Sequence, residues 1–209
     1  MKNSIFSKRM LAFVLAVSLF SFTRCIVPYE SARMLPKGGT ELKAAYTYVR
    51  VTERGEGEKL NDGLGLGLGY GVTNRVNLKV RYERISVEEG ASINYLVFGP
   101  KIALIPNKIA AMLPIGAYFE EGESTWGIHP ALLFTANQNN KVEGTFGLRG
   151  DIFFEEGAET LLGLNFGLGL SQNLDVWAIR PDFGLVFNPG ERGAFLTFGI
   201  GAQYNIVAK

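Results

Sequence analysis

The sequence predicts an all-β fold, a closed antiparallel barrel of ten strands, on the basis of three observations. Long segments alternate apolar and polar residues with a period of two, as strands do. Tight connections that contain asparagine alternate along the chain with acidic connections that contain glycine. The motif Glu-Glu-Gly begins at positions 88, 120 and 155, and these intervals of 32 and 35 residues each fit two strands with their turn.

Composition narrows the class of protein further. A chain of 209 residues is long enough for one domain with a well-buried interior. A formal net charge of +1 gives no reason to expect a nucleic-acid partner. A single cysteine and a single histidine exclude an intrachain disulfide and make a Cys/His zinc site a poor expectation, so we expect no metal and no cofactor.

The first 25 residues, 1–25, predict a secretory signal peptide. A basic start precedes a 13-residue apolar run, which is shorter than the roughly 20 residues that a membrane-spanning helix needs. Cys25 follows where a lipoprotein signal places its lipidated cysteine, although Arg24 replaces the small residue that such signals prefer. Two outcomes stay open: lipidation of Cys25, or cleavage nearby that leaves a free thiol. Residues 26–40 are then a lead-in to a barrel domain over 41–209.

The expected strands are the segments with the longest alternation. In 64–72 leucine alternates with glycine, and in 76–84 apolar residues alternate with Asn, Lys, Arg and Glu. The polar face of 141–154 is also charged, whereas 93–104 and 108–119 alternate less regularly. In chain order, we expect strands at 41–52, 64–72, 76–84, 93–104, 108–119, 125–136, 141–154, 160–171, 174–187 and 194–207.

Two classes of connection alternate between these strands and should lie at opposite ends of the barrel. Asparagine suits tight hairpin turns because it tolerates positive φ. The Glu-Glu-Gly period also predicts acidic tips near 55 and 190, where Glu56, Glu58 and Glu191 stand. The asparagine turns are 72–75, 105–108, 137–141 and 171–175, and the acidic connections are 53–62, 88–92, 120–124, 155–159 and 188–193.

The polarity of the strands separates two kinds of barrel. In a soluble barrel the apolar face would point inward, and in a membrane barrel it would point outward. The expected strands of 9 to 14 residues are long enough for the roughly 9–11 that cross a bilayer at a tilt, and many positions on the other face are glycine. The apolar face of the strands ends in aromatic residues, which suit the girdles at the two membrane interfaces: Tyr46, Tyr48, Tyr82, Phe119, Trp126, Phe154, Trp177 and Tyr204.

Over roughly 40–209 the chain resembles the small outer-membrane β-barrel proteins of Gram-negative bacteria. The segment LGYGVTNRVNLKVRYE (68–83) ends a strand, turns on asparagine and restarts with a polar inner face. GIGAQYNI (199–206) is similar to the terminal-strand signal of such barrels, although VAK follows it, and CIVPYESARMLPKGG (25–39) resembles a lipoprotein-like lead-in. The resemblance implies outer-membrane localisation, a periplasmic lead-in over 26–40, and periplasmic asparagine turns. It also implies outer-membrane lipid, lipopolysaccharide and the barrel-insertion machinery as partners.

The inner face predicts a lumen lined by charges rather than a catalytic site. We expect these charges to pair and to fill a small lumen, although a narrow channel for ions or small solutes stays open as a second reading. The sequence also admits an outer-membrane enzyme at the loop end, with His129 beside the tip glutamates or Asp151, and a secreted soluble barrel that holds a ligand. The acidic tips either keep the rim solvated or attract cations, and no pattern indicates an oligomeric state. The expected lumen-lining residues are Lys43, Lys79, Arg81, Glu83, Lys101, His129, Glu143, Arg149, Asp151, Arg180 and Asp182.

Overall fold

The strands of the structure are long and follow one another with short connections. The computed structural model describes residues 29–53, 56–87, 92–137, 139–155, 158–189 and 194–206. The expected signal peptide with Cys25, the first Glu-Glu-Gly motif and Glu191 lie outside the described residues. In chain order the strands of the described part are β1 (Thr40–Glu53), β2 (Glu56–Gly71), β3 (Val76–Val87), β4 (Ser92–Ile105), β5 (Ile109–Met112), β6 (Ile115–Glu120), β7 (Glu123–Ile128), β8 (Ala131–Asn137), β9 (Val142–Phe153), β10 (Leu161–Leu170), β11 (Trp177–Phe187) and β12 (Ala194–Ile206).

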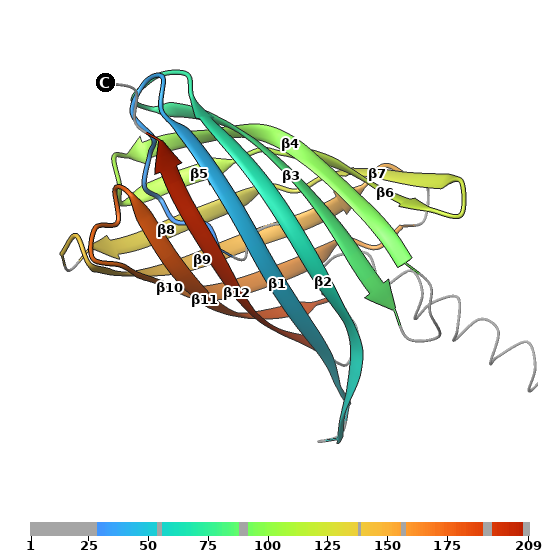
Figure 1. The fold of residues 1–209 in the computed structure, drawn as a ribbon. Coiled ribbons are helices and arrows are strands. Elements are labelled where there is room, and N and C mark those ends of the chain that lie inside the picture. Colours follow the sequence, from blue (N-terminus) through green and yellow to red (C-terminus); the bar gives the residue numbers. More distant parts are fainter. Residues whose placement is uncertain are drawn as a thin grey trace, which may run out of the picture.

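These strands form one antiparallel sheet that closes on itself where β1 pairs with β12 (Figure 1). Both β5 and β6 pair with β4, and both β7 and β8 pair with β9. The twelve strand segments of the described residues therefore make ten barrel strands. This arrangement confirms the predicted all-β, ten-stranded antiparallel barrel. No helix in the described ranges is long and apolar enough to cross a membrane.

Two prolines explain why the expected strands 108–119 and 125–136 are each broken in two. Pro114 separates β5 from β6, and Pro130 separates β7 from β8. Proline has no backbone N–H, so no hydrogen bond of the ladder can be donated at these two positions. The two breaks lie next to each other in the wall: the His129 backbone N–H donates to the Pro114 carbonyl at 2.9 Å.

The two ends of the barrel differ as the connections predict. The asparagine turns lie at the end where β1 begins and β12 ends, with Thr40 paired to Ile206. Asn107 adopts φ of 57°, whereas Asn139 shapes its turn by accepting hydrogen bonds from the backbone N–H of Lys141 and Val142 at 2.7 and 2.9 Å. We call this end the asparagine end.

The acidic stretch 53–62, which was expected to be a loop, is mostly strand. β1 continues to Glu53 and β2 already begins at Glu56, with these two residues paired. Glycine and acidic residues are typical of loops, but the ladder to β1 holds residues 56–62 in extended conformation. In Figure 1 the far end of the β1–β2 hairpin extends beyond the neighbouring strands.

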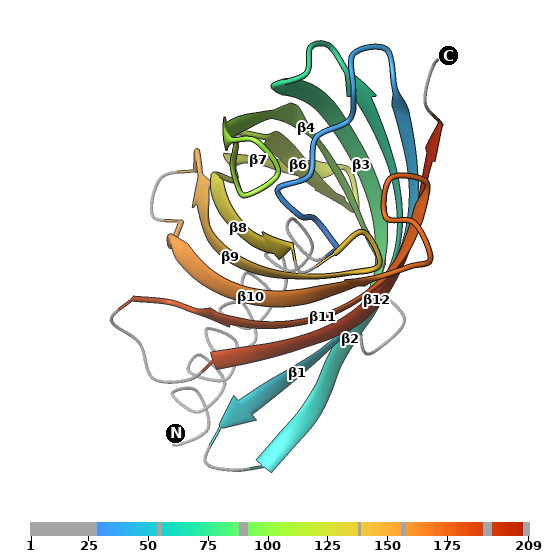
Figure 2. The ribbon, with the colours of Figure 1, turned by 90° about the vertical axis from the view of Figure 1, so that its left-hand side faces the viewer.

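Residues 29–39, the described part of the expected lead-in 26–40 before β1, enter the barrel. Figure 2 views the barrel from the asparagine end and shows this segment running inside the wall. The Tyr29 hydroxyl donates to the Tyr46 carbonyl at 2.6 Å, the Leu35 N–H donates to Asn77 Oδ1 at 3.1 Å, and the Gly38 N–H donates to a carbonyl of β2 at 2.8 Å. We call residues 29–39 the inner segment.

Candidate functional site: the barrel lumen

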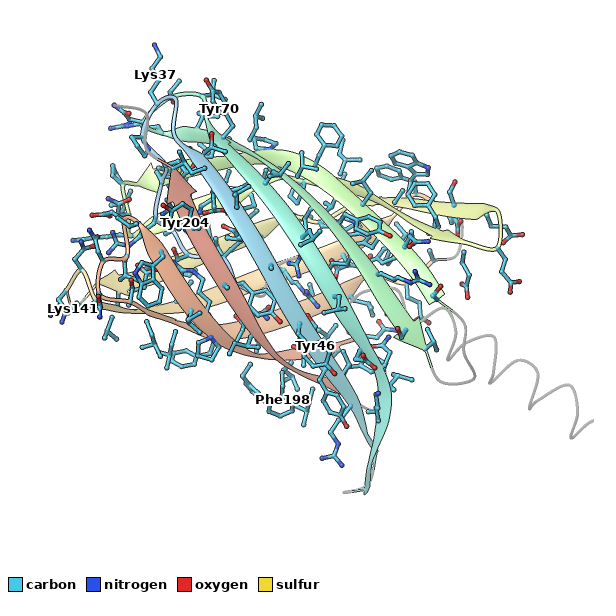
Figure 3. All side chains as sticks on the ribbon, viewed as in Figure 1. Lys37, Tyr46, Tyr70, Lys141, Phe198 and Tyr204 are labelled. Atoms are coloured by element: carbon cyan, nitrogen blue, oxygen red, sulfur yellow. The ribbon has the colours of Figure 1, made fainter. Side chains whose placement is uncertain are left out.

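The outer surface of the barrel is apolar. Leu66 is 65% exposed, and Figure 3 shows Tyr70 and Phe198 projecting away from the wall. A continuous apolar exterior of this extent is stable in lipid and unfavourable in water. The chain therefore forms a transmembrane barrel of the outer-membrane type, and this surface argues against a soluble ligand-binding barrel. Large apolar side chains exposed on the other strands include Leu78, Val80, Leu96, Phe98, Phe146, Leu148, Leu162, Phe166, Phe183, Ile200 and Tyr204.

The charged side chains lie on the opposite, inner face. They come from β1, β3, β4, β9, β11 and the break between β7 and β8, because alternate residues of a strand face the same side. Arg81, Asp182 and Lys43 are partly buried. The other expected lumen residues are buried, namely Lys79, Glu83, Lys101, His129, Glu143, Arg149, Asp151 and Arg180.

Inner-face glycines make room for these charges. Gly163 pairs directly with Arg149 across β10 and β9, and a Cβ at Gly163 would lie 2.5 Å from Arg149 Nε. Gly65 pairs in the same way with Glu83, and a Cβ there would lie 2.8 Å from Glu83 Oε1. The long charged side chain thus lies over the glycine opposite it. The same register holds for Lys79 with Gly69, Glu143 with Gly169, Asp182 with Gly167, and Arg180 with Gly201.

The first group of charges surrounds Glu30 of the inner segment. The Lys101 Nζ atom lies 3.1 Å from Glu30 Oε2, the Lys79 Nζ atom lies 3.6 Å from Glu30 Oε1, and Lys43 forms a close ion pair with the same carboxylate. Glu41 of β1 pairs with Lys79 at 2.5 Å and with Lys43 at 3.2 Å. We call Lys43, Lys79 and Lys101 the lysine cluster.

The second group centres on Glu143, which is fully buried and binds two guanidinium groups. Arg33 Nε of the inner segment lies 2.6 Å from Glu143 Oε2, and one terminal nitrogen of Arg180 lies 2.7 Å from Glu143 Oε1. Arg180 Nε also donates to Gln203 Oε1 at 2.8 Å, and Arg33 reaches the exposed Asp175 at 2.8 Å. The inner segment therefore contributes charges to both groups.

The third group brings His129 and Asp151 together, one of the two partner choices that the sequence left open. Nδ1 of His129 lies 3.0 Å from Asp151 Oδ1, and both side chains are 0% exposed. The stacked rings of Tyr95 and Tyr118 lie edge-on to the imidazole, with ring centroids 5.7 and 6.3 Å away. A general base must reach its substrate, and this pair is closed off by aromatic rings.

The second Glu-Glu-Gly motif forms the tip of the β6–β7 hairpin. Glu120, Glu121 and Glu123 border a hollow of about 310 Å³ with Tyr118 and Thr125. Partial burial raises the pKa of the Glu120 carboxyl above its ordinary value, and its two glutamate neighbours raise it further. Within the described residues, no group of three or more His, Cys, Asp or Glu is arranged to hold a metal ion.

Sequence reasoning missed Tyr29, Glu30 and Arg33, three inner-segment residues whose polar side chains bind groups of the lumen wall. It also missed Glu41, although the period of two from Lys43 assigns Glu41 to the inner face. For the inner segment the only local signal was a pair of charges, Glu30 and Arg33, in a stretch without strand alternation.

Comparisons with known proteins give likenesses among solved structures only. No protein-family model and no curated protein matches the sequence. An outer membrane channel from Pseudomonas putida F1 is 12% identical with a TM-score of 0.47, over 87% of this chain and 100% of that one. The translocator domain of the autotransporter NalP from Neisseria meningitidis is 10% identical with a TM-score of 0.42, over 97% and 96%. The attachment invasion locus protein Ail of Yersinia pestis is 17% identical with a TM-score of 0.39, over 81% and 99%. The fold assignment depends on the strand pairing and apolar exterior of this chain.

Proposed function

We propose that this protein is an integral envelope protein of the bacterial outer membrane whose lumen is closed at rest by its own inner segment. The observation that supports this proposal is the position of Tyr29, which is buried in the lumen against Gly199 and Gly201. A cavity of about 40 Å³ lies between the inner segment and the wall beside Glu30. That volume holds about one to a few water molecules, whereas ion conduction needs a continuous wet path.

Two properties of the barrel support the partners that we propose. The apolar exterior fits outer-membrane lipid, and the acidic hairpin tip fits the headgroup region of lipopolysaccharide through bridging divalent cations. The barrel-insertion machinery is the third proposed partner, because β1 and β12 form the seam that closes the sheet. We propose that the asparagine end faces the periplasm and the acidic tips face outward.

Planar-bilayer recording tests the closed lumen. The purified full chain should show heat-dependent gel mobility, as a folded barrel does, and no sustained conductance steps. Sustained steps from the folded wild-type protein would contradict closure. Single cysteines at Glu121 and Asn139 test orientation in intact cells, with the parent chain as the control for Cys25. Labelling at position 121 alone supports the proposed orientation, and labelling at position 139 alone reverses it.

We propose a packing role for the His129–Asp151 pair rather than a catalytic one. Burial of both side chains among Tyr95, Tyr118 and Phe153 supports this view. His129→Gln should lower the unfolding midpoint of the barrel and leave any surface hydrolase activity of the cells unchanged. A specific loss of such an activity from a variant that stays folded would favour an enzymatic role for the pair.

A further inference from the structure

We propose that the lysine cluster is a binding site for small anions of the carboxylate or phosphate class, and that Glu30 occupies this site in the closed barrel. When the inner segment withdraws, the same lysines make the opened lumen selective for anions. This inference depends on the proposed closure of the lumen by the inner segment. It adds a ligand class and a charge preference to that closure.

The cluster has the form of a built anion site. Its three ammonium groups come from three different strands, β1, β3 and β4, and converge on one carboxylate. Lys79 and Lys101 are buried, and Lys43 is nearly so, which weakens the screening of their charges by water. The strands that carry these lysines are held by the barrel ladder, so the site keeps its shape when its anion leaves.

The wall alone leaves this cluster with an excess of positive charge. Three lysines face one wall carboxylate, Glu41, so the wall contributes a local charge of 3 − 1 = +2. Glu30 reduces this charge to +1, but Glu30 belongs to the inner segment. Buried ammonium groups are costly without a counter-charge. An anion from solution therefore gains binding energy wherever Glu30 is absent.

The ion-pair group around Glu143 keeps a partner when the inner segment leaves, unlike the lysine cluster. This difference decides whether the opened lumen favours anions or cations. Arg33 is the inner-segment member of that group. Its removal leaves Glu143 paired with Arg180 at 2.7 Å. Withdrawal of the inner segment thus leaves unpaired positive charge at the lysine cluster but no comparable negative charge at Glu143. An opened lumen should favour anions over cations.

The inner segment can leave without breaking the barrel. Its backbone is held mainly by side chains of the wall, such as Thr135 Oγ1, which accepts from the Ala32 N–H at 2.7 Å, and Asn107 Oδ1, which accepts from the Met34 N–H at 3.1 Å. The β1–β12 seam closes the sheet independently of these contacts. A hollow of about 320 Å³ at the asparagine end, lined in part by Arg33, Leu35 and Asp175, gives the segment space to move.

Glu30→Gln in the full chain tests the site, with Glu121→Gln as the matched control that removes a carboxylate outside the lumen. The probe is inorganic phosphate, titrated against sodium chloride at equal ionic strength while urea unfolding is followed. Phosphate should raise the unfolding midpoint of Glu30→Gln, with a half-saturating concentration about tenfold or more below that of the wild type and the control. Adding Lys101→Met to Glu30→Gln should abolish this response. An equal phosphate response in all four proteins would overturn the proposal.

Reversal potentials in a potassium chloride gradient test the selectivity. Tyr29→Ala is the second variant, because it removes the ring that lies against Gly201 and leaves every wall ion pair in place. Currents from either folded variant should reverse at a potential that is shifted from zero toward the equilibrium potential of chloride. A shift toward the equilibrium potential of potassium would overturn the proposal. If the wild type already conducts, the proposed closure fails instead. If both variants are folded, closed and unresponsive to phosphate, the anion site fails while the closed barrel stands.

Discussion

Glu143 and Asp175 both bind the Arg33 guanidinium, and they differ in burial. The Glu143 side chain is 0% exposed and also binds Arg180, whereas the Asp175 side chain is 64% exposed. Glu143→Gln keeps the shape of the side chain but leaves two guanidinium groups in the lumen without their shared carboxylate. Breaking a buried pair in this way costs about 3–5 kcal/mol. Asp175→Asn removes a surface partner of the same arginine, at a cost of about 0–1 kcal/mol.

Urea unfolding of the barrel in lipid vesicles, followed by tryptophan fluorescence and by gel mobility, measures both variants. A loss of about 3 kcal/mol is a change of more than about 100-fold in the unfolding equilibrium, well outside the error of the method. The double variant should lose little more than Glu143→Gln alone, because both substitutions act on Arg33. Equal losses from the two single variants would refute the reasoning, since burial would then have no effect on the value of these ion pairs.

Three further predictions concern the glycines, the exterior and the acidic tip. Gly163→Ala should destabilise the barrel by about 1–3 kcal/mol in the same assay, because its Cβ would lie 2.5 Å from Arg149 Nε, whereas Gly144→Ala, whose Cβ would meet nothing closer than 4.0 Å, should be nearly neutral. Leu66→Arg should cost about 2–4 kcal/mol in vesicles if this exposed side chain lies near the bilayer midplane, and a neutral result would contradict a lipid-facing β2. The pKa of Glu120 is raised in the folded state, so its contribution to stability is present at low pH and is lost as the pH rises through that pKa. Glu120→Gln should therefore gain stability relative to the wild type between about pH 4 and pH 7, and a difference independent of pH would contradict this assignment.

Alternation along single strands made the barrel and its inner charges predictable. Lys79, Arg81 and Glu83 could be assigned to one face because every second residue of a strand shares a side. The period of the Glu-Glu-Gly motif predicted ten strands, which the pairing confirms. The break at Pro114 was visible in the sequence as a proline, but the continuation of the strand beyond it depends on the ladder to β4.

Contacts between distant parts of the chain were not predictable in the same way. The inner segment binds Asn77, Thr135 and Glu143, which lie 42, 103 and 110 residues from their partners in the sequence. No local pattern encodes such pairings. The choice of Asp151 over the tip glutamates as the partner of His129 likewise depends on how β7 and β8 are aligned with β9.

The pairing of glycine with charge across the strands has a consequence for how this barrel can vary. In pairs such as Gly163 with Arg149 and Gly169 with Glu143, the charged side chain occupies the space that a side chain at the glycine position would need. A larger residue at the glycine requires a smaller residue at its partner, so the two positions should change together across descendants of this sequence. On the lipid face, a residue such as Leu66 has no partner of this kind and can drift among apolar types. In a water-soluble protein the exposed polar residues tolerate substitution and the apolar core constrains it. In this barrel the exposed residues that tolerate substitution are apolar, and the inner residues that must change in pairs are polar.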